Sequence, residues 1–528
     1  LIANRSEIAI RISRAATELG YRTVSIYSYE DRFALHRFKT DESYLVGSGL
    51  GPIQAYLDYK GIVQIAINSG CDAIHPGYGF LSENPDFADE CEKHNILFVG
   101  PSSKIMRSLG NKVEAKKTAN KAKVPTIPST GPLPKDISKC KSLAKKIGYP
   151  IMLKASWGGG GRGMRVIRKE SELENQINTA RREAKSAFGK DDVFYERLIE
   201  KAFHVEVQII GDTHGNIVHL FERDCSLQRR HQKVVERAPA AYLSQKERNE
   251  ICEAGVRIGQ QVNYSCAGTV EFLMDAKSRE FYFIEVNPRV QVEHTVTEEI
   301  TGIDIVKAQF LLAAGAKIGD NVCGVPAQKD IQMKGHAIQS RVTTEDAAND
   351  FAPDYGKITV YRSASGHGIR LDAGTAATGT VITPYYDSLL VKVSAKGQTP
   401  IEAKERMNRA LSEFRVRGVK TNIPFLLKLI NHDGFDKFDY HTKFIDSEKS
   451  LFEFSSRKDR ATKTLNFLAE VIVNGNAEVA NRPKLRETIP AKLSDYGIAK
   501  SKKAQQAVGQ TFKQILDHKG PEEVAKSV

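Results

Sequence analysis

Polar and apolar side chains alternate along residues 281–294, which read FYFIEVNPRVQVEH. Even positions from Tyr282 to Val292 are apolar, Pro288 included. The polar side chains stand at odd positions: Glu285, Asn287, Arg289, Gln291 and Glu293. In an extended chain, this period of two places them all on one face. Because Pro288 cannot donate to a strand ladder, we expect the middle of the segment to be a loop that can face a ligand.

Such alternation is also typical of an edge strand with a solvated face. A solvated strand favours Thr, Lys and Ser, whereas this stretch carries two carboxylates, two amides and a guanidinium. These groups are suitable ligands for a cation and for a planar anion. The composition therefore favours a binding face.

Residues 1–110 alternate short apolar runs with amphipathic stretches. IAIRISRAATEL places Ile8, Ile12, Ala16 and Leu19 on one helical face, TVSIYS reads as a strand, GIVQIAINSG as a helix and CDAIHPG as a strand end. This order predicts an α/β fold with a doubly wound parallel sheet. Ligands of such sheets bind beyond the carboxyl ends of the strands.

Two features of this first region each have two interpretations. The loop at residues 75–84, HPGYGFLSEN, carries Tyr78 between glycines, either as a packed aromatic in a tight turn or as a ligand contact. Lys112 opens a Lys-rich helix that we expect to end before Pro125. Its ammonium group could reach a phosphate or could simply be solvated.

A glycine-rich segment at residues 149–166, YPIMLKASWGGGGRGMRV, gives a stronger signal. Glycines let backbone N–H groups crowd around a polyphosphate, and Lys154 adds a point charge beside them. The spacing also satisfies G-x-G-x-x-G, but the dinucleotide fold needs a helix directly afterwards, whereas MRVIR is strand-like. We therefore predict a mobile lid over nucleotide phosphates, with a flexible linker as the alternative.

Residues 193–233 predict further strands of one sheet. VFYERLI reads as a strand, and HVEVQIIGDTHGNIVHLFERD as a hairpin with its turn at residues 212–216. The following run, ERDCSLQRRHQK, is dense in hydrogen-bond donors. Such a run is often a solvated face. Because it lies between two strands of the predicted sheet, we expect a lining of basic groups around an anion.

Residues 267–287 predict a hairpin whose two strands present Glu271 and Glu285 to one place, with Asn287 beside them. Oxygen ligands of this kind, together with nucleotide phosphates, hold Mg²⁺ or Mn²⁺. Paired carboxylates also serve as the acid and base of glycosidases. The glycine-rich segment favours a metal and a nucleotide, because glycosidases need no polyphosphate cradle.

Composition places the chain among ordinary globular proteins, with 528 residues, 41% hydrophobic and 27% charged. A chain of this length is too long for a single hydrophobic core, so we expect several packed subdomains.

The net charge of +13 comes from dispersed Lys and Arg, which favours small anionic substrates over a nucleic-acid track. The seven cysteines stand singly and are expected to be reduced. No apolar run reaches the length of about 20 residues that a membrane helix needs. We expect a soluble protein.

The assembled motifs resemble the ATP-grasp superfamily and, within it, the biotin carboxylase component of biotin-dependent carboxylases. The motifs that carry this resemblance, from residue 3 to residue 422, are ANRSEIAIR, HPGYGFLSEN, KASWGGGGRGM, ERDCSLQRRHQK, EVNPRVQVEH and RVRGVKTN. The segment RVTTEDAANDFAPDYGKITVYRSASGHGIRLDAG and the region after residue 451 are most similar to the pyruvate carboxylase branch. Ser6 departs from the family, which usually has Gly there.

The resemblance implies a reaction and its site. Bicarbonate would attack the γ-phosphate of ATP to give carboxyphosphate, and biotin would then be carboxylated. The residues implied to contact ATP are Lys112, Lys154, Gly160, Gly161, Met164, Glu196, Ile199, His204, Gln228, His231 and Leu273. The residues implied to hold Mg²⁺ or Mn²⁺ are Glu271, Glu285 and Asn287.

The same resemblance assigns the acid–base and anion-binding roles. Glu293 would deprotonate bicarbonate, and Arg341 would stabilise the enolate oxygen of biotin. The residues implied to hold bicarbonate are Lys233, Arg289, Gln291 and Val292. Tyr78 would lie near the biotin.

By resemblance, the chain would comprise a pre-ATP-grasp α/β domain at 1–112, an ATP-grasp domain at 113–315 with its lid at about 130–200, a mixed α/β domain at 330–448, and a tail at 449–528 leading toward a carboxyltransferase domain. Residues 498–510 predict a surface helix or a linker. Leu1 and the strand-like LIANR predict a fragment that lacks its first residues.

The sequence has no Ala-Met-Lys biotinylation site, so the biotin would arrive on another domain or chain. The expected partners are biotin carboxyl carrier and carboxyltransferase domains and further copies of the chain, as a dimer or a tetramer, without nucleic acid or membrane. We expect a cytoplasmic location, or the mitochondrial matrix if a transit peptide was removed. The alternatives are the carboxylase component of an acyl-CoA carboxylase, another ATP-grasp ligase, and a basic nucleic-acid-binding module.

Overall fold

The computed structural model describes residues 1–110, 112–156, 165–188, 191–374 and 376–454, and the short pieces 464–465, 467–469 and 471–472. The chain forms two compact units, Leu1–Phe454 and Ser455–Val528. The first unit carries the candidate site. The predicted helix or linker at residues 498–510 lies outside the described residues.

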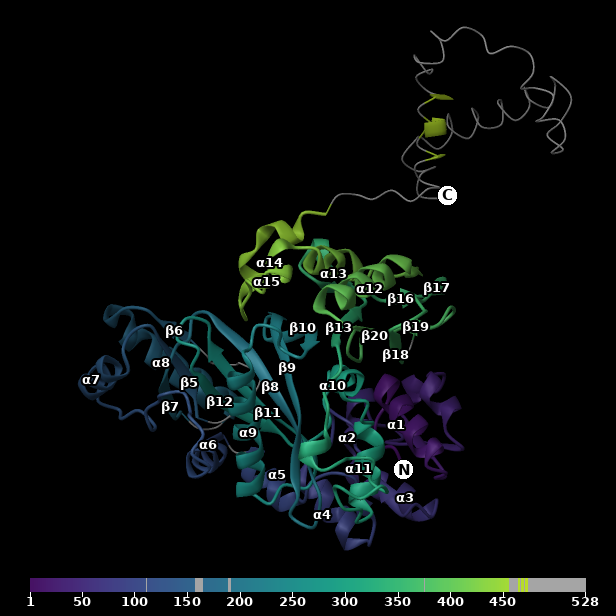
Figure 1. Ribbon diagram of the computed structural model, residues 1–528, viewed down its shortest axis with the longest axis horizontal. Helices are drawn as coiled ribbons and strands as arrows, with labels where there is room; N and C mark the ends of the chain where they lie inside the picture. Colours follow the sequence, from purple (N-terminus) through teal and green to yellow (C-terminus); the bar gives the residue numbers. More distant parts are fainter. Residues whose placement is uncertain are drawn as a thin grey trace, which may run out of the picture. The chain divides into compact units, whose positions relative to one another are not determined.

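The N-terminal region of the first unit builds small parallel sheets between helices (Figure 1). β1 pairs with β2 and β3 with β4, each in parallel. Ile2 forms parallel bridges to both Ser25 and His75, so it connects the two pairs. This pairing confirms the parallel α/β arrangement predicted for residues 1–110. Its elements are α1 (Ser6–Glu18), β1 (Val24–Tyr27), β2 (Glu42–Leu45), α2 (Pro52–Leu57), α3 (Tyr59–Asn68), β3 (Ala73–Ile74), α4 (Pro85–Lys93), β4 (Leu97–Phe98) and α5 (Ser103–Gly110).

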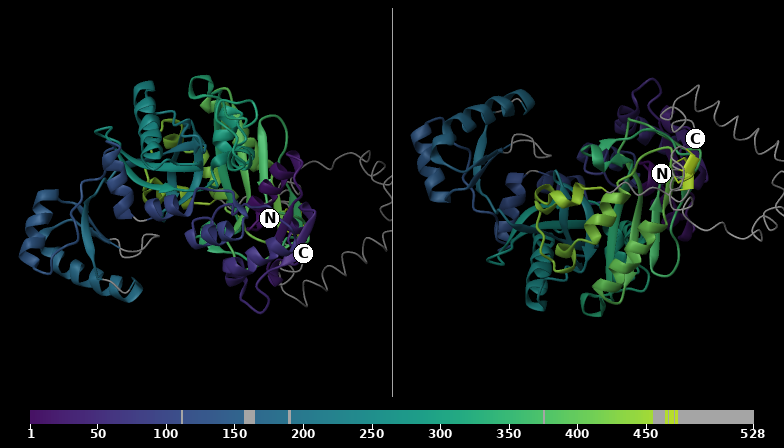
Figure 2. Two further views of the ribbon diagram at one scale, coloured as in Figure 1. Left: turned by 90° about the horizontal axis from the view of Figure 1, so that it is seen from below. Right: turned by 90° about the horizontal axis from the view of Figure 1, so that it is seen from above.

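The region around the glycine-rich segment forms its own small antiparallel sheet, ordered β6-β5-β7. Leu153, Ile167 and Ile177 are fully buried in its core. Figures 1 and 2 show this sheet, with α7 and α8, standing to one side of the large sheet. A strand directly after the glycines confirms the prediction made against a dinucleotide fold. The elements are α6 (Lys112–Lys121), α7 (Ile137–Ile147), β5 (Ile151–Ala155), β6 (Arg165–Ile167), α8 (Leu173–Phe188) and β7 (Val193–Arg197).

A large, mainly antiparallel sheet organises the rest of the unit, in the order β12-β11-β8-β9-β10-β13-β20-β18. The hairpins predicted at residues 204–224 and 267–287 are both present. The strands are β8 (Ala202–Gly211), β9 (Ile217–Arg229), β10 (Gln232–Ala238), β11 (Cys266–Asp275), β12 (Phe281–Asn287), β13 (His336–Thr343), β18 (Ile369–Ala373) and β20 (Leu389–Gly397). The helices in this part of the sequence are α9 (Gln245–Gln261), α10 (His294–Thr301) and α11 (Ile305–Ala313).

The C-terminal part of the unit covers the far end of this sheet. Val391 and Val393 of β20 pack with Met407 and Leu411 of α12 and with Leu426 of α13, all buried. The helices here are α12 (Pro400–Glu413), α13 (Ile423–Ile430), α14 (Asp433–Asp436) and α15 (Phe444–Ser447). Short strands pair beside them: β14 (Glu345–Asp346) with β15 (Ala352–Pro353), β16 (Gly356–Lys357) with β19 (Val381–Ile382), and β17 (Val360–Arg362) with β21 (Arg415–Arg417).

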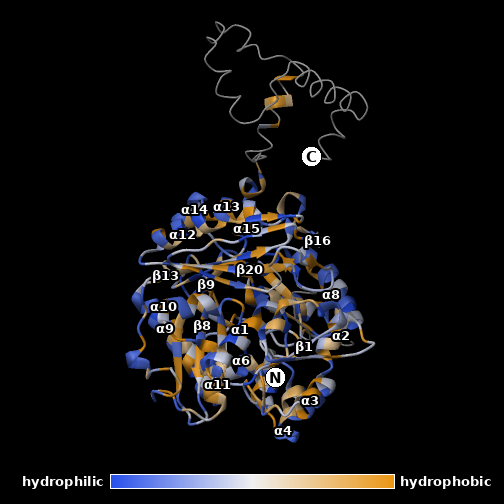
Figure 3. Ribbon diagram, turned by 90° about the vertical axis from the view of Figure 1, so that its right-hand side faces the viewer, coloured by the Kyte–Doolittle hydropathy of each residue, from blue (hydrophilic) through white to orange (hydrophobic). Residues whose placement is uncertain are grey.

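Hydropathy follows this layering. Figure 3 shows hydrophobic colour along strands of the large sheet and frequent hydrophilic colour on outer helices such as α12 and α14. Short 3-10 helices connect several elements, at Tyr29–Asp31, Leu35–Lys39, Glu170–Glu172, Gln328–Asp330, Ala347–Asn349 and Lys449–Phe452. Among the described residues, no helix combines the length and the apolar character needed to cross a bilayer.

The alternating segment at residues 281–294 is not one continuous strand. β12 ends at Asn287, the residue before Pro288, and α10 begins at His294. The missing N–H group of Pro288 ends the ladder there, as its sequence predicts. The polar residues after Asn287 are therefore presented by a loop.

Candidate active site

The large sheet brings charged side chains into one row across four strands. Glu285 of β12 is in register with Glu271 of β11, Glu271 with Glu206 of β8, and Glu206 with Arg223 of β9. Directly opposite residues in antiparallel strands point to the same face. The prediction that Glu271 and Glu285 face one place is confirmed.

Arg223 is the buried cation at the β9 end of this row. Its guanidinium is fully buried and donates to Oε1 of Glu206 at 2.6 Å and to Oε1 of Gln291 at 2.8 Å. It also donates to Gln208, Thr269 and Thr297. All of these contacts are within the protein, so Arg223 holds the side chains of the site in place from its buried side.

Three arginines of the basic lining predicted from residues 222–233 have carboxylate partners within the protein. Arg223 is buried with its partners, while Arg229 and Arg230 pair with Asp350 at 2.5 Å and 2.7 Å. His231 is exposed at the turn between β9 and β10. The alternation of a strand cannot show which charges find an internal partner, because the partners lie on other strands. Of these cations, Arg223 pairs with Glu206, and Lys233 contacts Glu206, Glu271 and Glu293.

Lys233 lies among three carboxylates. Its Nζ donates to Glu293 Oε1 at 2.5 Å, to Glu271 Oε1 at 3.0 Å, and to Oε2 of Glu206. Burial alone would lower the pKa of Lys233, but Glu206, Glu271 and Glu293 raise it well above its ordinary value. The ammonium group is therefore charged, and it links the carboxylate row to Glu293.

Glu293 is held by a different cation at each oxygen. Lys233 contacts Oε1, and Arg341 Nη2 donates to Oε2 at 3.1 Å. Burial would raise the pKa of Glu293, but Lys233, Arg341 and Arg223 hold it well below its usual value. The carboxylate is thus ionised and able to accept a proton.

Arg341 is itself oriented by a buried carboxylate. Its Nε donates to Oε1 of Glu236 at 2.6 Å, and Gln339 donates to the other oxygen of Glu236 at 2.9 Å. Burial alone would lower the pKa of Arg341, yet Glu236 and Glu293 raise it. The guanidinium is therefore permanently charged and fixed in direction.

The loop after β12 supplies the other predicted anion-binding residues. Gln291 donates to Glu271 Oε1 at 2.9 Å. Arg289 donates to Glu83 Oε1 at 2.5 Å and to Asn287 Oδ1 at 3.1 Å. The carbonyl oxygen of Val292 accepts from Lys392 at 3.1 Å. Gln291 thus joins the carboxylate row, whereas Arg289 is engaged by Glu83 of the N-terminal region.

The residues implied to contact ATP divide between the two sheets. In the small sheet, Lys154 donates to Glu196, which also accepts from Lys116 at 2.6 Å. Burial would raise the pKa of Glu196, but the two lysines lower it. This carboxylate is therefore ionised and anchors the lysine of the predicted lid.

In the large sheet, Gln228 Nε2 lies 3.0 Å from His204 Nδ1. His204 Nε2 lies 3.0 Å from Glu271 Oε2, and Leu273 is in register with His204 on the neighbouring strand. Ile199 is half-buried just after β7. The predicted contacts Gly160, Gly161 and Met164, and the side chain of Lys112, lie outside what the structure describes.

Tyr78 projects from its glycine-flanked loop to the first helix. Its hydroxyl donates to Oε1 of Glu7, and Gly77 and Gly79 both have positive φ, at 66° and 70°. These two left-handed positions are ones that glycine adopts readily. The loop is thus a tight turn with an anchored aromatic, and this anchoring does not test a role near biotin.

The donor chemistry fits a hard divalent cation. Glu271, Glu285 and Asn287 offer carboxylate and amide oxygens from paired strands. His204, Glu206 and Glu271 also place ligand atoms within 4.8 Å of one another, all three residues being buried. Mg²⁺ and Mn²⁺ prefer such oxygen-rich sites, completed by substrate phosphates.

The sequence interpretation missed two side chains of this cluster, Glu206 and Glu236. Glu206 stands two residues after His204 in an alternating strand, so its face could have been predicted. The role of Glu236 could not, because it depends on the pairing of β10 with β13, in which Glu236 is in register with Gln339.

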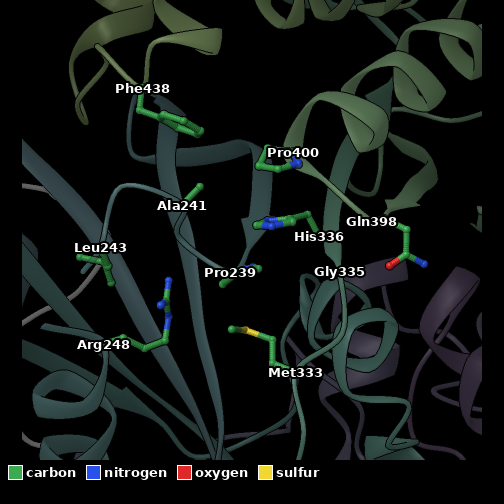
Figure 4. Close-up of a pocket in the computed structure, with 10 residues that line it drawn as sticks. All are labelled: Pro239, Ala241, Leu243, Arg248, Met333, Gly335, His336, Gln398, Pro400 and Phe438. Carbon is green, nitrogen blue, oxygen red and sulfur yellow. The ribbon is translucent and has the colours of Figure 1, made fainter. Parts of the chain in front are cut away.

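A separate cavity of about 500 Å³ lies at the opposite ends of β10 and β13 (Figure 4). Pro239, Met333 and His336 line it. None of its lining residues is a predicted site residue, since Lys233 and Arg341 stand toward the other ends of these strands.

Comparison with known proteins agrees with this geometry. Three family models match in sequence order: "Biotin carboxylase, N-terminal domain" at residues 1–106, "Carbamoyl-phosphate synthase L chain, ATP binding domain" at 111–321, and "Biotin carboxylase C-terminal domain" at 339–447. The fold and the site thus define an ATP-grasp ligase.

The relatives narrow this class. The biotin carboxylase domain of 2-oxoglutarate carboxylase from Hydrogenobacter thermophilus is 42% identical, with a TM-score of 0.80, and the match covers 86% of this chain and 98% of that one. The chain therefore belongs to the biotin carboxylase family. The subdomain limits predicted from the sequence remain predictions.

Longer relatives match as well. The pyruvate carboxylase of Bacillus subtilis is 53% identical over 528 residues, 100% of this chain and 45% of that protein. A pyruvate carboxylase of Rhizobium etli, solved with acetyl coenzyme-A, is 58% identical with a TM-score of 0.82, over 92% of this chain and 43% of that one. The chain spans less than half the length of these two relatives.

Proposed function

We propose that the chain carries out the ATP-dependent carboxylation of biotin with bicarbonate, as the first half-reaction of pyruvate carboxylation. One observation carries this proposal: the ionised Glu293 is held between Lys233 and Arg341, beside the carboxylates of Glu206 and Glu271. This reaction requires a base, two cationic side chains that bind anions, and an oxygen-rich metal site.

The base acts on bicarbonate. Glu293 accepts its proton, and an oxygen of the resulting carbonate attacks the γ-phosphorus of ATP, so that ADP leaves and carboxyphosphate forms. Lys233 holds the negative charge of the anion close to that carboxylate. When an anion shares Lys233, Glu293 loses part of the attraction that lowers its pKa, and its basicity rises toward what proton transfer needs.

Two groups of residues support the nucleotide in this proposal. Lys154, fixed by Glu196, meets the phosphates from the small sheet, together with Lys112, Gly160, Gly161 and Met164. His204, Gln228, His231, Leu273 and Ile199 complete the contacts. Glu271, Glu285 and Asn287 would hold Mg²⁺ or Mn²⁺, which neutralises phosphate charge when bound.

Carboxyphosphate then breaks down to CO₂ and phosphate; N1′ of biotin passes its proton to that phosphate and bonds to the carbon of CO₂. Arg341 meets the charge that develops on the ureido oxygen, since Glu236 keeps its guanidinium directed at the site. Arg289, Gln291 and Val292 hold the bicarbonate, and Tyr78 borders the biotin. The biotin comes from a carrier domain outside residues 1–528.

Pyruvate is the proposed final acceptor, because the pyruvate carboxylases of Bacillus subtilis and Rhizobium etli match the chain over 100% and 92% of its length. An acyl-CoA carboxylase component is the second candidate within the family. We propose that the complete protein joins carrier and carboxyltransferase domains and assembles into homo-oligomers. It would work in the cytoplasm or, if a transit peptide was removed, in the mitochondrial matrix; the relative of mouse is named as mitochondrial.

The decisive assay is ADP release with free biotin, with and without bicarbonate. We expect release to depend on bicarbonate and to rise with biotin. Release that ignores bicarbonate would favour another ATP-grasp ligase. In the complete protein, carboxylation of pyruvate that avidin blocks would identify the acceptor, and carboxylation of an acyl-CoA instead would contradict it.

A further inference from the structure

A lysine without solvent contact lies directly behind the proposed base. Lys392 of β20 is fully buried, and its Nζ donates to the carbonyl oxygen of Val292 at 3.1 Å. Val292 is the residue before Glu293, so this hydrogen bond fixes the peptide group from which the base projects. Burying an ammonium group costs several kcal/mol unless it is paired, which makes such a lysine rare in a core.

The register of the sheet places this lysine beside Arg341. Lys392 is opposite Arg341 on β13 and opposite Asp372 on β18. The carboxylate of Asp372 is occupied by Arg370, whose Nε donates to it at 2.9 Å. Burial would raise the pKa of Asp372, but Lys392 and Arg370 lower it. Lys392 also has an ion-pair partner from the beginning of the chain: Oε2 of Glu7, on α1, lies 3.1 Å from Nζ.

Glu7 also contacts Tyr78, the residue proposed to border the biotin. The hydroxyl of Tyr78 donates to Oε1 of Glu7, while Oε2 faces Lys392. Burial raises the pKa of Glu7 to about 7, although Lys392 opposes that rise. One buried carboxylate thus joins the Tyr78 loop to the lysine that holds the Glu293 segment.

We propose that Lys392 is a positioning residue that fixes the backbone ahead of Glu293, and that Glu7 couples this contact to Tyr78. The inference rests on the proposed function, because it takes Glu293 as the base. Lys392 is too deeply buried to touch a substrate, so it acts through Val292. In this way α1, the loop of Tyr78 and β20 together determine the position of the Glu293 carboxylate.

Lys392→Met in the full chain tests the proposal. Methionine keeps much of the volume but loses the donor and the charge, and Glu7, with its pKa near neutrality, can take up a proton in place of its lost partner. We expect kcat for bicarbonate-dependent ADP release to fall about 100-fold, the cost of a misplaced reacting group. The affinity for ADP, measured by calorimetry, should change less than about twofold, because no proposed nucleotide contact is touched.

The matched control is Lys404→Met. Lys404 lies on α12, and its Nζ forms an ion pair with Asp436 at 2.5 Å that this substitution removes. It should leave kcat and ADP affinity unchanged. Glu7→Gln is the second variant, used also if Lys392→Met fails to fold: it removes the negative charge that pairs with Lys392 and leaves one amide oxygen in place of two carboxylate oxygens. We expect about a tenfold lower kcat with the same ADP affinity, since only part of the connection is lost.

Full kcat in Lys392→Met, or in Glu7→Gln where only that variant folds, overturns the inference. So does a parallel loss of ADP affinity, because it would indicate general loss of structure. If the unaltered chain itself shows no bicarbonate-dependent ADP release, the proposed function fails instead, and the two failures are thereby distinguished.

Discussion

Glu271 and Glu285 stand directly opposite each other on the paired strands β11 and β12. Like charges so placed repel unless a cation lies between or beside them. Lys233 and His204 approach Glu271, at 3.0 Å each. Burial would raise the pKa of Glu271, but these two side chains lower it. Glu271 is therefore ionised opposite Glu285, as the proposed metal site requires.

The first prediction concerns this pair. Glu285→Gln removes one charge from the metal site and should weaken ADP binding at least about tenfold in the presence of Mg²⁺. Binding without the metal should be unchanged. Calorimetry with and without Mg²⁺ measures both values. Glu280→Gln, exposed in the same hairpin, is the control, and equal losses in the two variants would contradict the assignment.

The second prediction concerns the base. Glu293→Gln should lower bicarbonate-dependent ADP release by about 10²-fold or more, because the proton acceptor is lost. ADP affinity should stay within about twofold, since the proposed phosphate contacts remain. Turnover equal to that of the unaltered chain would refute the role of Glu293.

The third prediction separates the two chemical steps. Arg341→Ala should spare most ATP cleavage while biotin carboxylation falls by about 10²-fold, because the fixed positive charge is lost. ADP release and incorporation of labelled bicarbonate into biotin are measured side by side. Arg341→Lys keeps a charge without the fork that reaches both Glu236 and Glu293, so it should recover little of the carboxylation. Equal loss of both steps would speak against this division.

The fourth prediction concerns acid stability. Burial lowers the pKa of His219 to about 4, from an ordinary value of 6.5. The unfolded chain therefore binds this proton at a higher pH than the folded chain, and the stability is lost as pH falls from about 6.5 toward 4. His219→Gln should reduce the drop in Tm between pH 7.5 and pH 5. An identical drop in both chains would contradict the shift.

The fifth prediction concerns Ser6, where the family resemblance of the sequence led us to expect Gly. The residue has a φ of 56°, in the left-handed region, at the start of α1. Ser6→Gly should raise the free energy of unfolding by about 0.5–1 kcal/mol, because the steric cost of that φ exceeds the entropy lost by glycine. Thr17→Gly, exposed within the same helix, should instead cost up to about 1 kcal/mol. A lower Tm for Ser6→Gly would refute this account.

Local patterns were sufficient for the elements and for part of the site. The alternation around Glu271 and Glu285 predicted their strands, and the short turn between them predicted their pairing, so their meeting followed from the sequence. The position of Pro288 likewise predicted where β12 ends.

Burial and distant pairing were beyond such patterns. Arg223 looks in sequence like its neighbours Arg229 and Arg230, and only Glu206 on the next strand makes it a core residue. Glu7 and Lys392 belong to the two ends of the described unit, and neither has a local feature that announces the other. Contacts of this kind depend on the tertiary fold, which no single window of sequence contains.

The pairing of β10 with β13 carries the large sheet across the gap between two family matches, which end at residue 321 and begin at 339. A chain cut in that gap would leave β10 as an open edge and uncover Leu227, Val234 and Val235, which pack with the C-terminal residues. Dividing the gene in this gap should therefore yield insoluble halves unless the two halves are co-expressed, although the gap lies between two family matches.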